Sequence, residues 1–245
     1  MPAYTFFYPH DLIIADEIEL SDEESHHAIS VMRLTQGEEV FVLNGQGLEA
    51  KALVLPSKKR CRLKLLEISR KTLQNPIKLS LLQGLTSIAK ADLIVEKLTE
   101  LGLDEIAFFA AERSGRQRMN EHQLQKLEQK VIGACKQSGR LWLPTLKWYE
   151  SLEERFQSPA IQSHLWITLD PLGKPWRNEF PKLPAYQAYT LVVGPESGLS
   201  PGELELLSSH GAKPFNIHPH ILRAETAAVS GACLLEHYTA AIKER

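Results

Sequence analysis

Over roughly the first 70 positions, apolar and polar residues alternate in short runs. Three runs rich in apolar residues predict β-strands, at 40–43, 48–55 and 63–68. The Asn-Gly-Gln-Gly sequence at 44–47 is a hairpin-type turn signal between the first two runs. One helix is predicted within 21–34, where Ser21 is the N-cap and Glu24 completes a capping box. We therefore predict a small, mainly β domain over residues 1–72.

Beyond Pro76 the pattern changes to apolar runs of strand length that alternate with long stretches of helical periodicity. The segment 71–76 marks the boundary, because the residue before a proline, here Asn75, disfavours helix. Strands are predicted at 77–85, 105–111, 164–170, 189–194 and 214–217, and helices at 89–102, 120–139, from about 201, and at 224–243. This alternation predicts an α/β domain over residues 73–245, with a mainly parallel sheet covered by helices on both faces.

Composition narrows the class of protein. Hydrophobic residues make up 43% of the 245 positions and charged residues 24%, as in an ordinary globular protein. No apolar run approaches the ~20 residues that span a bilayer, and the N-terminus lacks the pattern of a secretory signal. Three widely spaced cysteines argue against a disulfide framework, and neither they nor the histidines have metal-ligand spacing. We expect a cytoplasmic protein without a metal and without a membrane partner.

The net charge of −2 argues against a protein held to nucleic acid by bulk charge alone. Two local stretches are nevertheless basic: 58–71 carries seven cations against one glutamate, and 113–118 carries three arginines. Each stretch is either a solvated surface or a contact to a polyanion.

The sequence Gly-Pro-Glu-Ser-Gly-Leu-Ser at 194–200 follows a predicted buried strand. Ser200 is a predicted N-cap, Pro201 suits the first helical position, and Glu203 completes a capping box. Residues 194–199 therefore form a loop at the carboxyl end of a parallel strand, where ligands bind in open α/β sheets. Gly194 and Gly198 would let the backbone approach such a ligand closely.

The ligand of this loop is not predicted to be a dinucleotide. The chain has no Gly-x-Gly-x-x-Gly after its first strand and no P-loop lysine. Glu196 would also repel a pyrophosphate. A ligand with a cationic or neutral head group and an adenosine fits this loop better. S-adenosylmethionine is such a ligand. An ordinary strand-to-helix turn without a ligand is the alternative.

A second site-like stretch covers 218–232. Arg223, Glu225 and Thr226 stand between two apolar residues and an alanine-rich helix. Small residues in that helix predict very close packing against another surface, at Ala227, Ala228, Gly231 and Ala232. A surface ion pair between Arg223 and Glu225 is the alternative to a functional role.

Six segments together resemble one family. They are HHAISVMRL (26–34), EKLTELG (96–102), ERSGR (112–116), QSGR (137–140), GPESGLS (194–200) and ILRAETA (221–227). In this order and spacing they are similar to the RsmE family of the SPOUT superfamily, whose members methylate N3 of a uridine in 16S ribosomal RNA with S-adenosylmethionine. The likeness runs from about residue 5 to 240, and the Gly-Pro-Glu turn and Leu-Arg-x-Glu-Thr segment are specific as a pair.

The resemblance implies a PUA-like β-barrel that helps to bind RNA, followed by a SPOUT-type α/β fold with a C-terminal trefoil knot. It also implies a homodimer with the active site at the interface, which the small-residue face of the last helix would fit. The residues implied for the cofactor are Leu169, Val193, Gly194, Pro195, Glu196, Gly198, Ile217, Leu222, Thr226 and Ala227. RNA contacts are expected from Arg33, Arg62, Arg113 and Arg116, each with a solvated surface arginine as the alternative.

Methylation of N3 requires loss of the imide proton and stabilisation of charge on the uracil oxygens. The candidates for that stabilisation are Arg223 and Arg140, with Arg113 third, and the proton would pass to Glu225 or to water.

The chain departs from the family pattern at three places. Ser197 replaces a usual glycine, the tripeptide from His218 to His220 replaces Gly-x-Arg, and the N-terminal stretch YTFFYPHDL (4–12) lacks a usual arginine. A SPOUT-like protein that binds RNA or cofactor with weakened activity is therefore an alternative, and a Rossmann dehydrogenase is a more distant one.

Overall fold

The computed structural model describes residues 4–56, 59–72, 77–114, 118–157 and 164–243. Its contacts divide the chain into two compact units. The first unit comprises Met1–Gln74 and Ile132–Leu143, and the second comprises Asn75–Val131 and Pro144–Arg245. The short segment Ile132–Leu143, which the sequence pattern places with the α/β domain, thus belongs to the first unit.

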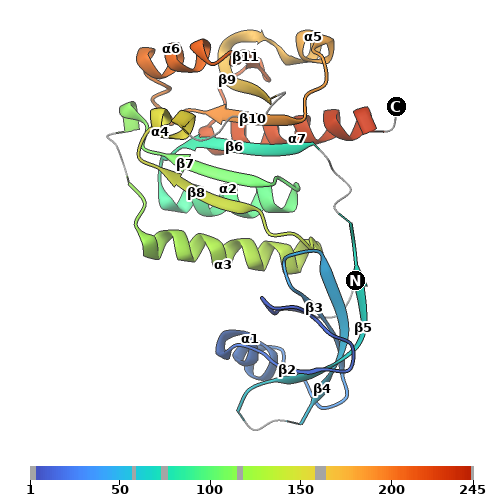
Figure 1. Ribbon diagram of the computed structural model, residues 1–245. Helices are drawn as coiled ribbons and strands as arrows, with labels where there is room; N and C mark the ends of the chain where they lie inside the picture. The colour runs from blue at the N-terminus through green and yellow to red at the C-terminus, as the bar shows by residue number, and fades with distance from the viewer. Residues whose placement is uncertain (1–3, 57–58, 73–76, 115–117, 158–163, 244–245) are drawn as a thin grey trace. The chain divides into compact units, whose positions relative to one another are not determined.

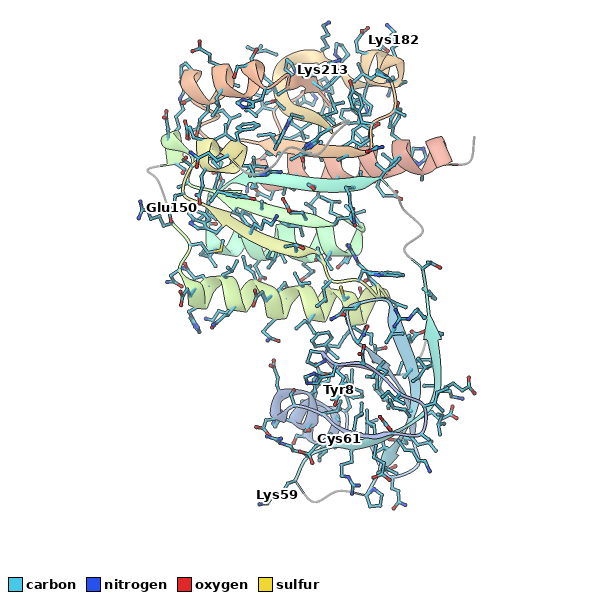
Figure 2. The ribbon with its side chains drawn as sticks, in the orientation of Figure 1. Tyr8, Lys59, Cys61, Glu150, Lys182 and Lys213 are labelled. Carbon is cyan, nitrogen blue, oxygen red and sulfur yellow. The ribbon has the colours of Figure 1, made fainter. Side chains whose placement is uncertain are left out.

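The first unit is built on a five-stranded curled sheet (Figure 1). Its strands are β1 (Thr5–Phe7), β2 (Glu17–Glu19), β3 (Glu39–Leu43), β4 (Leu48–Leu55) and β5 (Arg62–Arg70), in the order β1-β3-β4-β5-β2. All neighbours are antiparallel except β1 and β3. Alternate residues of β3 to β5 fill the core, to which Cys61 also contributes (Figure 2). The three strands predicted in this region are confirmed, whereas β1 and β2 were not predicted.

The helix of this unit, α1 (Asp22–His26), continues as a π-helical turn at His27–Val31. Ser21 caps it by accepting a hydrogen bond from the Glu24 amide at 3.2 Å. The predicted capping box is wrong in its second half. The Glu24 carboxylate is buried and instead accepts from the Phe7 amide at 3.3 Å and from Lys136 Nζ at 2.5 Å, two partly buried donors that other segments bring to it.

Residues 141–143 pack onto the β3–β4 turn. The Gly47 amide donates to the Leu141 carbonyl at 2.9 Å, and the Leu143 amide donates to the Gly45 carbonyl at 3.1 Å. Both glycines have positive φ, and a Cβ on Gly47 would lie 2.8 Å from the Trp142 ring. This docking, together with the Glu24–Lys136 pair, explains why Ile132–Leu143 groups with the first unit.

The second unit contains a six-stranded parallel sheet in the order β11-β9-β10-β6-β7-β8. Its strands are β6 (Lys78–Gly84), β7 (Glu105–Phe109), β8 (Thr145–Tyr149), β9 (His164–Pro175), β10 (Ala188–Val193) and β11 (Lys213–Asn216). The helices are α2 (Ile88–Glu100), α3 (Glu121–Ser138), α4 (Leu152–Gln157), α5 (Trp176–Glu179), α6 (Pro201–Ser209) and α7 (Ala224–Lys243), with 3₁₀ turns at Glu112–Ser114 and Phe180–Lys182. The end of α3, from Ile132 onward, belongs to the first unit. The predicted α/β class is confirmed; the trefoil knot stays a prediction.

Helices cover the two faces of this sheet, as predicted (Figure 1). Val192 of β10 packs in a cluster with Leu152 of α4 and Leu207 of α6. Its neighbour Leu191 points to the opposite face, where a Cβ on Gly231 of α7 would lie 3.4 Å from it. Helix α7 also contacts α2 on that face.

The small residues of α7 allow this close approach within one chain. Ala228 and Ala232 are fully buried, and a Cβ on Gly231 would lie 2.6 Å from Leu169 Cδ1. The chain's own sheet covers this small-residue face, so the face gives no support to a dimer interface, and the homodimer stays a prediction. Among the described residues, no helix is both long and apolar enough to cross a membrane.

His164 gives the second unit a pH-dependent stability. Burial, together with the nearby Arg155 charge, lowers the pKa of His164 from 6.5 to about 4. His164 therefore becomes protonated near pH 6.5 in the unfolded chain, but only at about pH 4 in the folded chain. We expect stability to fall as pH decreases through this window, by at most about 1.4 kcal/mol per pH unit.

Urea unfolding at a series of pH values tests this, with His164→Gln as the control. Glutamine can keep a hydrogen bond to Thr190 Oγ1, which lies 2.8 Å from His164 Nε2, but it does not titrate. The free energies of unfolding of wild type and variant should diverge between pH 7 and about 4. Parallel curves would contradict the role of His164.

Candidate active site

A cavity of about 530 Å³ lies at the carboxyl ends of the central strands of the second unit. Three segments form its walls: 168–172 at the end of the regular part of β9, the turn after β10, and the loop between β11 and α7. The lining is mainly apolar, with a few polar groups, and the volume is in the range of small-molecule sites. This is the edge of the sheet at which the sequence predicts a ligand.

The turn after β10 is held in shape by the first residues of α6. Ser200 Oγ accepts from the Glu203 amide at 3.0 Å, and Glu203 Oε2 accepts from the Ser200 amide at 2.7 Å. Pro201 occupies the first turn of the helix. The predicted capping box is thus confirmed in both halves. Gly198 has φ +75°, a conformation that favours glycine.

Two neighbouring strands also anchor this turn. Gln83 Nε2, at the end of β6, donates to the carbonyls of Val193 and Gly194 at 3.2 and 3.1 Å. Glu203 Oε1 accepts from the Glu112 amide just beyond β7, at 3.0 Å. Neither contact was predicted, although a glutamine inside the apolar β6 run was a visible signal. The turn is therefore a rigid wall rather than a loose loop.

The opposite wall is tied by Asn216. Its Nδ2 donates to the Pro171 carbonyl at 2.7 Å, and its Oδ1 accepts from the His218 amide at 2.9 Å. This joins the β9 segment to the loop before α7. Leu172 and Ile221 line the same cavity with 94% and 85% of their surface exposed, so two apolar side chains stand at its rim.

Nine of the ten residues predicted to bind the cofactor line this one cavity: Leu169, Val193, Gly194, Pro195, Glu196, Gly198, Ile217, Leu222 and Ala227. Thr226 is exposed in α7 and is not part of the lining. The structure also adds lining residues that were not predicted, among them Thr168, Asp170, Leu199, Phe215 and Asn216. The cofactor-binding role of the whole set stays a prediction.

The predicted catalytic residues are not all in one place. Arg223 is exposed and lines the cavity just before α7. Glu225 lies in the first turn of α7, outside the lining. Arg140 belongs to the first unit.

The predicted RNA contacts are also dispersed. Arg33 is exposed in the first unit with φ +57°, a left-handed conformation that is uncommon for arginine. Arg62 pairs with Glu17 across β5 and β2, and Arg60 pairs with Glu19 and Asp22, so part of the basic stretch is neutralised within the chain. Arg113 lies beside the turn after β10, and Arg116 lies outside the described residues.

Ser197, the departure from the family glycine, makes a defined contact. Its Oγ donates to the Arg113 carbonyl at 2.7 Å, and Arg113 Nη1 donates to the Ser197 carbonyl at 3.4 Å. Serine therefore adds a link between the turn and the segment after β7 that glycine could not make.

Replacing Ser197 by alanine should reduce stability by about 0.5–1 kcal/mol, because it removes one partly solvated hydrogen bond. Thermal unfolding of the variant measures this, with Ser209→Ala as the matched control. Ser209 Oγ makes a similar 2.8 Å bond to the Leu206 carbonyl, but within α6 and away from the turn. Only Ser197→Ala should also weaken ligand binding at the cavity; equal effects on binding would contradict a role of Ser197 in the turn.

The chemistry of the cavity suits a ligand with an apolar ring system and a positive charge. Its walls offer apolar surface for a base, and the Glu196 carboxylate, which is half exposed at the lining, offers a partner for a cation. In the described part of the chain, no group of three or more His, Cys, Asp or Glu side chains is placed to hold a metal ion. The residues present therefore fit S-adenosylmethionine.

Comparison with known proteins agrees with this reading. Residues 73–236 match the model of an RNA methyltransferase domain, and residues 20–66 match that of an RNA methyltransferase PUA domain. The predicted PUA-like character of the N-terminal region is thus confirmed.

The relatives share one name. Ribosomal RNA small subunit methyltransferase E of Bacillus subtilis is 27% identical over 92% of this chain and 91% of its own length. The protein of that name from Aquifex aeolicus is 32% identical over 66% of this chain and 70% of its own length.

Solved structures are similar over nearly the whole chain. A methyltransferase of Legionella pneumophila, solved with the bound cofactor SAM, superposes with a TM-score of 0.86 at 26% identity, over 97% of this chain and 98% of that one. Ribosomal RNA small subunit methyltransferase E of Neisseria gonorrhoeae shares the fold with a TM-score of 0.81 at 22% identity, over 96% and 97% of the two chains. Because the domain model covers most of the sequence and the relatives carry one name, this chain belongs to the RsmE family of ribosomal RNA small subunit methyltransferases.

Proposed function

We propose that this protein methylates N3 of one uridine in 16S ribosomal RNA, with S-adenosylmethionine as the methyl donor. The observation that carries the proposal is the strand-end cavity, around which nine residues predicted for the cofactor come together from three separate segments. Family membership supplies the reaction class. We further propose that the protein acts in the cytoplasm as a homodimer.

S-adenosylmethionine, when bound, supplies an electrophilic methyl group on a positively charged sulfur. The protein must hold it and must help the uracil to lose its N3 proton. Glu196 complements the positive charge, and the apolar lining receives the adenine and excludes water. Gly194 leaves room at the turn, because a Cβ there would lie 3.0 Å from the Leu199 amide nitrogen.

Arg223 is the residue that we assign to charge stabilisation. As the N3 proton leaves, negative charge spreads to the O2 and O4 atoms of uracil, and an arginine donor lowers the energy of that state. Arg223 lines the cavity and is exposed, so it is available to an entering base. Glu225 does not line the cavity, which favours water as the acceptor of the proton. Arg140 is not among the residues that line the cavity, and its catalytic role stays a prediction.

RNA would be held by the first unit and by Arg113. Arg62 is a weaker candidate than Arg33 because its charge is already paired with Glu17. A folded RNA is recognised by shape and by bases that are turned out of the helix, so a few positioned arginines suffice. This explains how a chain of net charge −2 could act on RNA.

The deciding experiment maps 16S ribosomal RNA by mass spectrometry from a strain that lacks the gene and from the complemented strain. One uridine should lose its methyl group on deletion and regain it on complementation. If no uridine changes, the substrate assignment is wrong. Restoration by an Arg223→Ala variant as complete as that by wild type would instead contradict the role assigned to Arg223.

Calorimetry separates the cofactor classes. We expect S-adenosylmethionine to bind the purified protein and NAD to give no heat. Binding of NAD alone would support the dehydrogenase alternative and contradict the proposal.

A further inference from the structure

Lys90 lies between two of the segments that form the cavity. It stands in the first turn of α2, where Ser87 caps the helix by accepting from the Lys90 amide at 3.3 Å. Its Nζ contacts Glu196 Oε1, in the turn after β10. The same Nζ lies 3.5 Å from Glu225 Oε2, in the first turn of α7. One ammonium group thus bridges two walls that are separated by about 30 residues of chain.

This arrangement is more than a surface ion pair. The Glu225 side chain is only 12% exposed, and its Oε2 is buried without a hydrogen-bond partner among the described residues. A buried carboxylate is costly unless a positive charge compensates it. The first turn of α7 helps, since a helix N-terminus favours negative charge. Lys90 is the cation that the structure places beside it.

The charges of the cluster have a consequence for the ligand. Two carboxylates against one ammonium leave a formal charge of −1 beside the cavity. Glu196 lines the cavity, whereas Lys90 and Glu225 do not. Lys90 therefore holds the turn that carries Glu196 in place. It also determines the net negative charge on this wall of the cavity.

We propose that Lys90 is a positioning residue of the cofactor site, which fixes the Glu196 turn against the start of α7 and sets the preference for a cationic ligand. The inference rests on the proposed function, because it takes S-adenosylmethionine as the ligand. Lys90 acts through Glu196 and Glu225 and makes no contact with the cofactor.

Calorimetry of Lys90→Gln tests the proposal with two ligands: S-adenosylmethionine, and its product S-adenosylhomocysteine, which lacks the sulfonium charge and is the uncharged ligand in that sense. The variant should bind both ligands about tenfold more weakly, because the two walls lose their link. Its preference for the charged ligand over the uncharged one should rise about two- to fivefold, because the cluster goes from −1 to −2. Glu196→Gln changes the formal charge of the cluster from −1 to 0 and should lower that preference. Lys90→Arg should retain wild-type values within about threefold.

Lys97 provides the matched control, since it lies on the same helix and pairs with Glu96 at 2.8 Å and Glu100 at 2.9 Å on the surface. Lys97→Gln should change neither affinity. If Lys90→Gln does not fold, the double variant Lys90→Gln/Glu225→Gln takes its place. It removes the unpaired carboxylate together with its partner, and it should fold and show the same weakened binding. Unchanged affinities, or an equal loss for both ligands with an unchanged preference, would overturn the inference. Failure of the wild-type protein to bind S-adenosylmethionine would instead refute the proposed function.

Discussion

Replacement of Arg223 by alanine is expected to lower the rate of methyl transfer by roughly 100- to 1,000-fold, the usual effect of losing one donor that stabilises developing charge. The affinity for S-adenosylmethionine should stay within about threefold of wild type, because the guanidinium acts mainly on the uracil and not on the ground-state cofactor. Arg223 is exposed at the cavity, so its removal leaves no buried group without a partner. Single-turnover methylation of unmethylated small ribosomal subunits, with cofactor affinity from calorimetry, measures both quantities.

Arg223→Lys is the control for charge. Lysine keeps the positive charge but cannot offer the planar fork of arginine, so its rate should fall between those of wild type and alanine. A loss of cofactor affinity as large as the loss of rate would show that Arg223 holds the cofactor instead. A rate equal to wild type in the alanine variant would show that another arginine, such as Arg140, stabilises the charge.

Local chemistry could be predicted where neighbouring residues decide it. The Ser200–Glu203 capping box depends on residues three positions apart, and the structure contains both of its hydrogen bonds. Gly102 ends α2 with φ +86°, as expected of a glycine just beyond a helix. The location of the cavity could be predicted from these local signals, since they place the turn at the end of a parallel strand.

What sequence alone could not predict are the contacts between distant segments. The Glu24 carboxylate pairs with Lys136, 112 positions away, instead of capping its own helix, although the local sequence has the pattern of a capping box. Lys90 and Glu196 are 106 positions apart, and no periodicity relates them. The three-residue strands β1 and β2 are too short to show alternation. In each case the partner is determined by packing, which only the assembled fold specifies.

Glu203 is the residue whose loss should most reduce the stability of the cavity wall. It is 3% exposed, and its two oxygens accept hydrogen bonds from the Ser200 and Glu112 amides. The first bond fixes the start of α6, and the second fixes the segment that carries Arg113. Because Arg113 in turn exchanges hydrogen bonds with Ser197, one carboxylate supports the turn from both sides.

Glu203→Ala is therefore expected to reduce the free energy of unfolding by about 2–3 kcal/mol, the sum of a lost helix cap and a lost charge-assisted hydrogen bond. For a chain of this size, that corresponds to a fall in Tm of roughly 5–10 °C. Glu203→Gln should lose about half as much, because its one carbonyl can still accept from one of the two amides. The alanine variant should also bind S-adenosylmethionine more weakly, since Ser200 directly follows the turn that lines the cavity. Calorimetric Tm and ligand affinity, measured on the same samples, test both effects. A stable variant with weakened binding would show that the cap and the turn are not coupled, and so would an unstable variant with intact binding.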